Sequence, residues 1–168
     1  MNYAAIKSHD IANGPGVRVS LFVSGCTHRC KDCFNQEAWD FDYGEPFDDA
    51  VMDRILDLLA PAYIKGITYL GGEPLDPRNQ AGLLELSRRI KARYPDKSIW
   101  CFTGYVWERL PRVDGVTDEL ISCCDVLVDG PFIAARKNLS LRFRGSDNQR
   151  LIDIPKTRTE GRIVLWNE

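Results

Sequence analysis

The sequence lacks a long hydrophobic run, and no apolar stretch approaches the roughly 20 residues that a membrane-spanning helix requires. Residues 1–7 lack the apolar core and the small-residue cleavage site of a secretory signal. An excess of positive charge is also missing, since 22 basic residues face 24 acidic ones and the formal net charge is −2. We therefore expect a cytoplasmic protein that engages no membrane and no nucleic acid.

No repeat, low-complexity tract or Gly/Ser-rich linker divides the 168 residues, which predicts a single domain spanning residues 1–168. A chain of this length buries an adequate core without a metal ion or disulfide, so any bound metal is expected to serve function. The six cysteines, in a chain without a secretory signal, indicate reduced thiols and metal ligation. Cys101, Cys123 and Cys124 lie in apolar surroundings and are expected to be buried thiols.

Three of the cysteines are close together in residues 25–34, GCTHRCKDCF, directly after the apolar run 17–23. The spacing CxxxCxxC allows Cys26, Cys30 and Cys33 to converge on one soft metal centre. Iron–sulfur clusters are usually held by four cysteines, so a cluster held by three has one open iron. Such an iron can bind a substrate or a second cofactor, which makes the motif a candidate site of chemistry.

The same cysteines also allow a structural zinc site, in which His9 or His28 completes a Cys₃His shell. Zinc ligands of this kind normally come as two pairs separated by a longer segment, and the sequence has no second CxxC pair. This absence favours iron and sulfur. A zinc-stabilised binding module without catalysis is the competing hypothesis from a different functional class.

Strand and helix patterns alternate along most of the chain. Segments rich in β-branched and aromatic residues predict strands at 17–23, 66–70, 98–103 and 126–128. Apolar residues at helical spacing predict helices at 48–60, 77–94 and 117–124 between them. Repeated strand–helix units imply parallel strands, in a doubly wound sheet or a barrel. In the less regular tail we expect short strands at 139–144, 150–154 and 162–166.

Functional residues of both architectures collect at the carboxyl ends of the parallel strands. The four predicted strands end in the cysteine motif, in Gly71-Gly72-Glu73-Pro74, in Thr103-Gly104 and in Asp129-Gly130. All four groups are therefore expected at one rim. An open iron beside a glycine-lined backbone, two carboxylates and a hydroxyl would suit a small zwitterionic ligand.

These motifs, in this order, resemble the radical S-adenosylmethionine superfamily, whose CxxxCxxC signature matches residues 26–33 and whose Gly-Gly-Glu-Pro motif matches residues 71–74. Within it, the chain resembles the activating proteins of anaerobic ribonucleoside-triphosphate reductases, a family of glycyl-radical enzyme activases. This resemblance rests on the sequences NGPGVR at 13–18, CFNQ at 33–36, TGY at 103–105, DGPF at 129–132 and RGSDNQR at 144–150.

The resemblance implies a radical S-adenosylmethionine oxidoreductase with a [4Fe-4S] cluster on Cys26, Cys30 and Cys33. S-adenosylmethionine would bind the open iron and yield a 5′-deoxyadenosyl radical, which takes hydrogen from a glycine of the reductase. The implied partners are that reductase and a low-potential electron donor such as flavodoxin. Two alternatives share this chemistry: an activase of another glycyl-radical enzyme, and a small-molecule enzyme such as a deazapurine synthase.

The resemblance also implies which residues bind the cofactor, with no catalytic residue beyond the cluster and the S-adenosylmethionine site. Glu73 is expected to accept a hydrogen bond from the ammonium group of the cofactor. Many family members carry an aromatic residue where this chain has Asp32, so Phe34 is the alternative platform for adenine. The full set of implied cofactor-binding residues is Asp32, Cys33, Phe34, Gly71, Gly72, Glu73, Pro74, Thr103 and Asp129.

The chain is shorter than the about 250 residues typical of an eight-unit barrel. We therefore expect a partial (β/α) TIM-like barrel of about five to six units, with mostly parallel strands and one open side that admits a macromolecular substrate. A basic stretch near the C-terminus is interpreted as a solvated face, a docking surface for the reductase, or a hold on the cofactor's carboxylate. It contains Arg136, Lys137, Arg142, Arg144 and Arg150.

Overall fold

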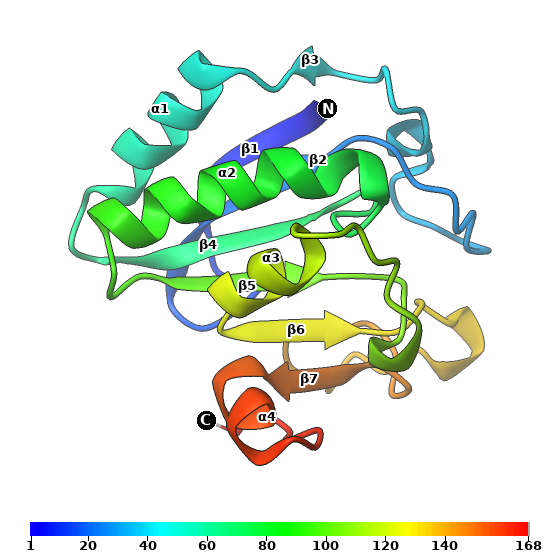
Figure 1. Cartoon of the computed structure of the whole chain (residues 1–168). Coiled ribbons are helices and arrows are strands. Elements are labelled where there is room, and N and C mark those ends of the chain that lie inside the picture. Colours follow the sequence, from blue (N-terminus) through cyan, green and yellow to red (C-terminus); the bar gives the residue numbers. More distant parts are fainter. Residues whose placement is uncertain (168) are drawn as a thin grey trace.

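The computed structural model describes residues 1–167 and contains a seven-stranded sheet in the order β3-β1-β2-β4-β5-β6-β7 (Figure 1). Its parallel centre is made of β2 (Val17–Val23), β4 (Ile64–Gly71), β5 (Ser98–Phe102) and β6 (Val126–Asp129). The outer strands, β1 (Asn2–Asp10), β3 (Glu45–Pro46) and β7 (Arg150–Asp153), pair antiparallel with their neighbours. The sheet is open, and the predicted partial barrel of five to six units is not confirmed.

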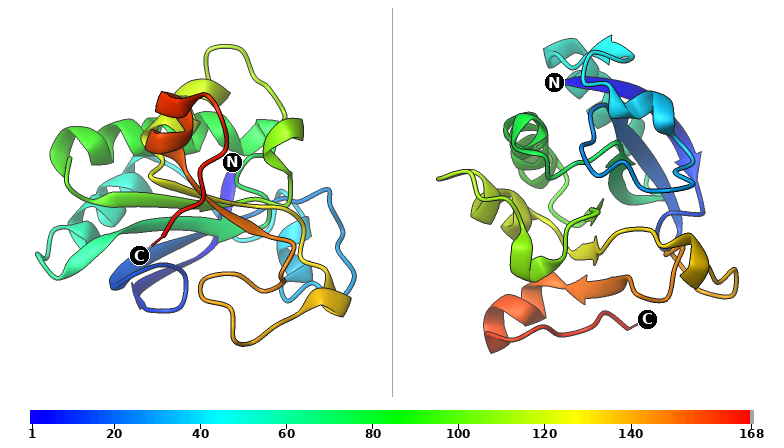
Figure 2. Two further views of the ribbon diagram at one scale, coloured as in Figure 1. Left: turned by 90° about the horizontal axis from the view of Figure 1, so that it is seen from below. Right: turned by 90° about the vertical axis from the view of Figure 1, so that its right-hand side faces the viewer.

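The expected alternation of strands and helices is confirmed in the centre of the chain. Helices α1 (Asp49–Leu59), α2 (Pro77–Arg93) and α3 (Thr117–Cys123) connect successive parallel strands and cover one face of the sheet (Figures 1 and 2). Asp48 and Asp76 begin the first two helices, since their carboxylates accept from the backbone N–H groups of Val51 and Arg78. Within residues 1–167, no helix combines the length and the apolar character needed to cross a bilayer.

The tail differs from its prediction. Of the three expected strands, only the middle one forms, as β7, and it runs antiparallel to β6. The next residues form helix α4 (Ile154–Glu160), which packs against α3 and begins at the capping carboxylate of Asp153. The described part of the chain also contains three short 3₁₀ helices, at Gln36–Trp39, Trp107–Arg109 and Ala134–Arg136.

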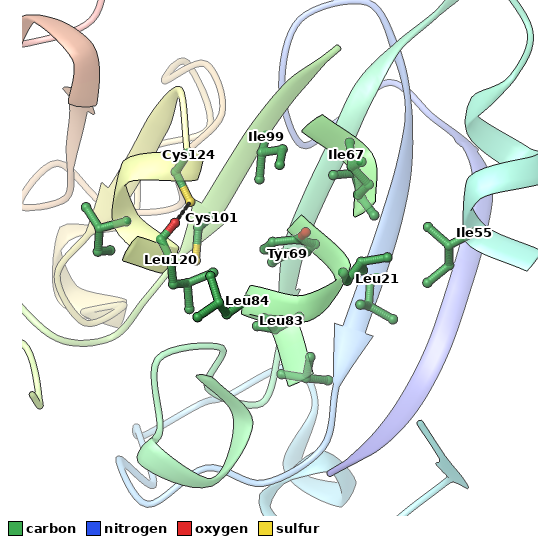
Figure 3. Packing of buried hydrophobic residues seen from close by; sticks show 14 of the residues in the cluster. Leu21, Ile55, Ile67, Tyr69, Leu83, Leu84, Ile99, Cys101, Leu120 and Cys124 are labelled. Carbon is green, nitrogen blue, oxygen red and sulfur yellow. Dashed lines mark hydrogen bonds between the residues drawn. The ribbon is translucent and has the colours of Figure 1, made fainter. Parts of the chain in front are cut away.

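The main hydrophobic core lies between the sheet and its helices (Figure 3). Side chains alternate along a strand, so Leu21 of β2 and Ile67 of β4 point toward the helices and belong to the same core as Leu83 of α2. Cys101 and Cys124 belong to this core, as expected from their apolar surroundings, whereas Cys123 is half-buried.

The opposite face of the sheet holds a buried cation, Arg18 of β2. Its guanidinium donates to the hydroxyls of Thr68 and Ser98, both at 2.9 Å, and to the carbonyl of Ile67 at 2.7 Å. Burial lowers the pKa of Arg18 to about 10, and the ring of Trp100 lies 5.6 Å away. Arg18 thus joins three neighbouring parallel strands.

Candidate iron–sulfur and cofactor site

The carboxyl ends of the parallel strands meet at one edge of the sheet, together with the cysteine loop that follows β2 (Figure 1). Two adjoining cavities lie there, with volumes of about 410 Å³ and about 120 Å³. Their shared lining comes from four separate segments of the chain: Cys33, Phe34, Gly71, Gly72, Gly104 and Phe132. The predicted convergence of strand-end residues at one rim is confirmed.

The three motif cysteines all line the smaller cavity, and none forms a disulfide. Burial raises the pKa of Cys26 to about 11, and burial together with the nearby Cys33 raises the pKa of Cys30. The loop reverses direction sharply, because Arg29 and Asp32 have φ angles of 49° and 61°. Because their pKa values are raised, Cys26 and Cys30 are thiols at neutral pH when no metal stabilises the thiolate.

The donor set fits an iron–sulfur cluster with three protein ligands. Within residues 1–167, no three side chains from histidine, cysteine, aspartate or glutamate close on a single ion position. A four-iron cluster takes its thiolates on separate irons, so its ligands surround a cube instead of a point. Three free thiols from one short loop, lining one cavity, match that arrangement.

The two histidines occupy different parts of the molecule. His9 lies near the end of β1 that pairs with Arg18, whereas the cysteine loop follows Val23 at the other end of β2. Its ring nitrogens contact Ser8 and Tyr63. His28 lines the smaller cavity with the cysteines. The alternative in which His9 completes a zinc shell is therefore excluded by its position.

Gly71 and Gly72 allow the end of β4 to approach the cysteine loop closely. Gly71 has a φ of 112°, and a Cβ on Gly72 would lie 2.5 Å from the carbonyl oxygen of Gly25. The Gly72 N–H donates to the carbonyl of Val23, and the Glu73 N–H donates to that of Gly25, at 2.8 Å and 2.7 Å. These glycines thus join two parts of the protein backbone, in addition to lining both cavities.

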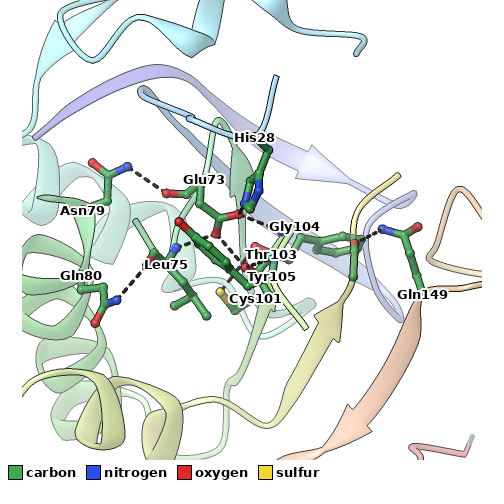
Figure 4. A network of polar contacts seen from close by, with 12 residues as sticks. His28, Glu73, Leu75, Asn79, Gln80, Cys101, Thr103, Gly104, Tyr105 and Gln149 are labelled. Atoms are coloured by element: carbon green, nitrogen blue, oxygen red, sulfur yellow. Dashed lines mark hydrogen bonds and ion pairs between the residues drawn. The ribbon is translucent and has the colours of Figure 1, made fainter. Parts of the chain in front are cut away.

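Glu73 is 1% exposed, and its carboxylate is saturated by donors from the protein (Figure 4). Oε1 accepts from Leu75 N and Thr103 Oγ1, each at 2.8 Å. Oε2 accepts from Gly104 N and from His28 Nε2, each at 2.7 Å. A carboxylate has about four acceptor positions. The expected hydrogen bond from a ligand's ammonium group to Glu73 stays a prediction, and in this structure it would have to displace one of these donors.

Thr103 and Asp129 lie at the strand ends but differ in their access to the cavities. Thr103 lines the larger cavity. Asp129 is buried and pairs with Arg150, whose Nε and Nη2 reach its two carboxylate oxygens at 3.0 Å and 2.5 Å. It also accepts from the backbone N–H of Trp107, while Gly130 lines the cavity. These contacts favour strand-end support over ligand contact for Asp129.

Phe34 is 82% exposed and lies at the edge of both cavities, 5.5 Å from the ring of Phe132. Asp32 is exposed and lines neither of these two cavities. Pro74 lines the larger one. Of the residues expected on the adenine side, Phe34 and Cys33 are thus the two that border the space available to a ligand.

The basic residues of this stretch have partners both inside and outside it. Arg136 pairs with Asp147, and Arg144 donates to the carbonyl of Gln149. Lys137 lies 5.6 Å from the ring centroid of Phe34. None of the five basic residues lines either cavity at the rim. Their position does not support binding of the cofactor's carboxylate by the basic stretch. The two remaining interpretations of this stretch are a solvated face and a docking surface for the reductase.

Several cavity residues were not predicted from the sequence as cofactor-binding residues. Asn13, Phe132, Gly145 and Gln149 line the larger cavity, brought there by loops far apart in the chain. All four belong to the motifs that carried the family resemblance, NGPGVR, DGPF and RGSDNQR. Membership in those motifs was the sequence signal that could have identified them as cavity residues. From the sequence, His28 is a candidate only as a zinc ligand.

Comparison with known proteins gives consistent matches over most of the chain. The model of the 4Fe-4S single cluster domain matches residues 12–152. An anaerobic ribonucleoside-triphosphate reductase-activating protein of Pasteurella multocida is 44% identical over 151 residues, which cover 89% of this chain and 95% of the relative. Proteins of the same name are 43% identical in Escherichia coli K12, covering 89% and 96%, and 40% identical in Enterobacteria phage T4, covering 90% and 93%.

Proposed function

Because this chain belongs to the family of anaerobic ribonucleoside-triphosphate reductase-activating proteins and contains a 4Fe-4S single cluster domain, we propose that it forms the glycyl radical of that reductase. It is a radical S-adenosylmethionine enzyme whose cofactors are a [4Fe-4S] cluster and S-adenosylmethionine. The observation that carries this conclusion is that three free cysteines and the Gly71–Gly72 backbone line one cavity. That cavity adjoins a larger one of about 410 Å³.

When bound, the cluster and S-adenosylmethionine supply one electron and the 5′-deoxyadenosyl radical that removes a hydrogen atom from a glycine of the reductase. The protein holds the cluster through the thiolates of Cys26, Cys30 and Cys33. Phe34 and Phe132 form an apolar border at the edge of both cavities.

The remaining expected residues divide into two groups by their contacts. Gly71, Gly72 and Pro74 offer backbone and a rigid turn to the methionine part of the cofactor, and Phe34 takes the place that Asp32 leaves open beside adenine. Glu73, Thr103 and Asp129 support these surfaces by joining the loops that carry them, as their hydrogen bonds indicate.

The electron needed for the reaction comes, in this proposal, from a low-potential donor such as flavodoxin, and the reaction takes place in the cytoplasm. Neither part follows from the site itself. An assay that supplies a chemical reductant separates the activase reaction from the identity of the natural donor.

The test is anaerobic incubation of the iron-loaded protein with dithionite, S-adenosylmethionine and the reductase, followed by electron paramagnetic resonance. We expect a glycine-centred doublet that requires all three additions and is lost in Cys30→Ser. A preparation with about four irons per chain that yields no doublet would reject the proposal.

A further inference from the structure

His28 connects the cysteine loop to the loops that follow β4 and β5 (Figure 4). It lies between Cys26 and Cys30, and its ring is turned inward, with 18% of the side chain exposed. Its Nε2 is 2.7 Å from Oε2 of Glu73. The ring also packs edge-on against Tyr105, with centroids 4.4 Å apart.

The space under the imidazole depends on glycine at position 104. A Cβ on Gly104 would lie 2.6 Å from Cδ2 of His28, closer than two such atoms approach. The Gly104 N–H donates to the same carboxylate oxygen that His28 contacts. The loop after β5 is therefore shaped to receive this side chain.

Through Glu73, the contact of His28 extends to two further loops of the chain. The Glu73 carboxylate also accepts from Leu75 N and Thr103 Oγ1, so it joins the loops after β4 and β5. Since an ionised carboxylate only accepts hydrogen bonds, the Nε2–H of His28 is the donor. Buried hydrogen bonds to a charged group are stronger than neutral ones and hold their partners in one geometry.

Resting on the proposed function, we propose that His28 is a positioning residue. It fixes the cluster-bearing loop relative to the glycine-lined wall that receives S-adenosylmethionine. Its side chain acts through Glu73, whose Oε2 lies 2.7 Å from Nε2. Loss of the imidazole should therefore weaken binding of the cofactor while the cluster itself is retained.

The experiment compares His28→Ala, His28→Asn and His28→Gln in the full chain, reconstituted anaerobically. The amide of glutamine reaches the position of Nε2, whereas that of asparagine falls at the position of Nδ1 and cannot reach Glu73. His9→Ala is the matched control, since it removes a histidine whose ring contacts Ser8 and Tyr63 far from the site. Each protein is titrated with S-adenosylmethionine, and the spectrum of the reduced cluster is recorded by electron paramagnetic resonance.

We expect all variants to contain as much iron as the parent and to give the same spectrum without S-adenosylmethionine. His28→Ala and His28→Asn should need about tenfold more S-adenosylmethionine for the half-maximal spectral change, the effect of one lost hydrogen bond to a charged group. His28→Gln should stay within about threefold of the parent. His9→Ala should be unchanged.

Three results would overturn the proposal. One is a parent-like titration of iron-loaded His28→Ala. Another is an equal S-adenosylmethionine requirement of His28→Asn and His28→Gln. This comparison tests the proposal even if His28→Ala does not fold. The third is a changed spectrum without S-adenosylmethionine, which would make His28 a ligand of the cluster. If the parent itself shows no spectral change, the proposed function fails instead.

Discussion

Asp32 has a left-handed backbone conformation in the cysteine loop, with a φ of 61°. Aspartate tolerates this region better than β-branched residues do, and glycine adopts it freely. The side chain is exposed and lines neither cavity at the rim. The backbone conformation at position 32, more than its carboxylate, therefore shapes the turn between Cys30 and Cys33.

Asp32→Val should destabilise the cluster-loaded loop by about 1–2 kcal/mol, because valine is strained at positive φ. Asp32→Gly should cost at most about 0.5 kcal/mol. Iron content after reconstitution and the rate of iron loss to a chelator measure the difference. If Asp32→Gly instead raises the S-adenosylmethionine requirement without affecting iron, the carboxylate contacts the cofactor after all.

Asp10 lies on the face of the sheet that carries Arg18, and its ionisation should make the free energy of unfolding depend on pH. Burial alone would raise its pKa, but hydrogen bonds from Ser20, Ala12 and Asn13 outweigh burial and lower the pKa below 3.8. The folded state thus prefers the ionised form. The stabilisation is complete above the unfolded pKa and is lost as the pH falls through the lower folded value.

We expect the difference in unfolding free energy between the parent and Asp10→Asn to be constant above about pH 5 and to shrink below about pH 3.8. Urea unfolding of the cluster-free proteins at several pH values measures it. A difference that grows on acidification would show that the pKa of Asp10 is raised.

At the scale of elements, the junction between β4 and the cysteine loop is the most demanding packing of the site. A Cβ on Gly72 would lie 2.5 Å from the carbonyl oxygen of Gly25 and 2.8 Å from that of Ala38. Both are backbone atoms, so the cysteine loop itself would have to move.

Gly72→Ala should cost about 1–3 kcal/mol and reduce the iron content. Gly82→Ala is the control within α2, where the nearest atom is the flexible Met1 sulfur at 3.0 Å and alanine favours the helix by about 1 kcal/mol. Equal iron contents in the two variants would contradict the close packing described for Gly72.

The helices and central strands were predictable because their signals are local. Asp48 caps α1, Asp76 caps α2, and the apolar run 17–23 forms β2. Strand β1 was missed because its apolar pattern is weak: most of its side chains are partly exposed, and its last four residues, KSHD, are all polar. Helix α4 was not predicted, although Asp153 and the proline in the first turn are typical of a helix start; only its first residue, Ile154, lies in the strand expected at 150–154.

At the scale of the whole molecule, the motifs predicted which residues meet at one rim but not how their side chains are paired. Three of the four donors to the Glu73 carboxylate come from positions 28, 103 and 104, and Asp129 pairs with Arg150 across β6 and β7. Such partners depend on the sheet order. The antiparallel edge strands, which make the sheet open, likewise leave no signal in strand–helix periodicity.

We expect the reductase to contact the exposed surface that carries Phe34, Lys137 and Leu139. Phe34 and Leu139 are 82% and 88% exposed, and Lys137 lies over the Phe34 ring. Lys137→Glu should therefore weaken the complex with the reductase several-fold, with a smaller salt dependence. Lys156→Glu on α4 is the control, and binding is measured by titration calorimetry. Equal affinities would support the solvated face as the correct interpretation of the basic stretch.

The proposed reaction requires a cluster with three cysteine ligands and one iron open to S-adenosylmethionine. Electron–nuclear double resonance on the reduced, iron-loaded protein with S-adenosylmethionine labelled at its amino nitrogen tests this directly. We predict a coupling between that nitrogen and the cluster, unchanged when Cys101, Cys123 and Cys124 are replaced by alanine. The absence of coupling at saturating S-adenosylmethionine, with a protein side chain on the fourth iron, would contradict the account.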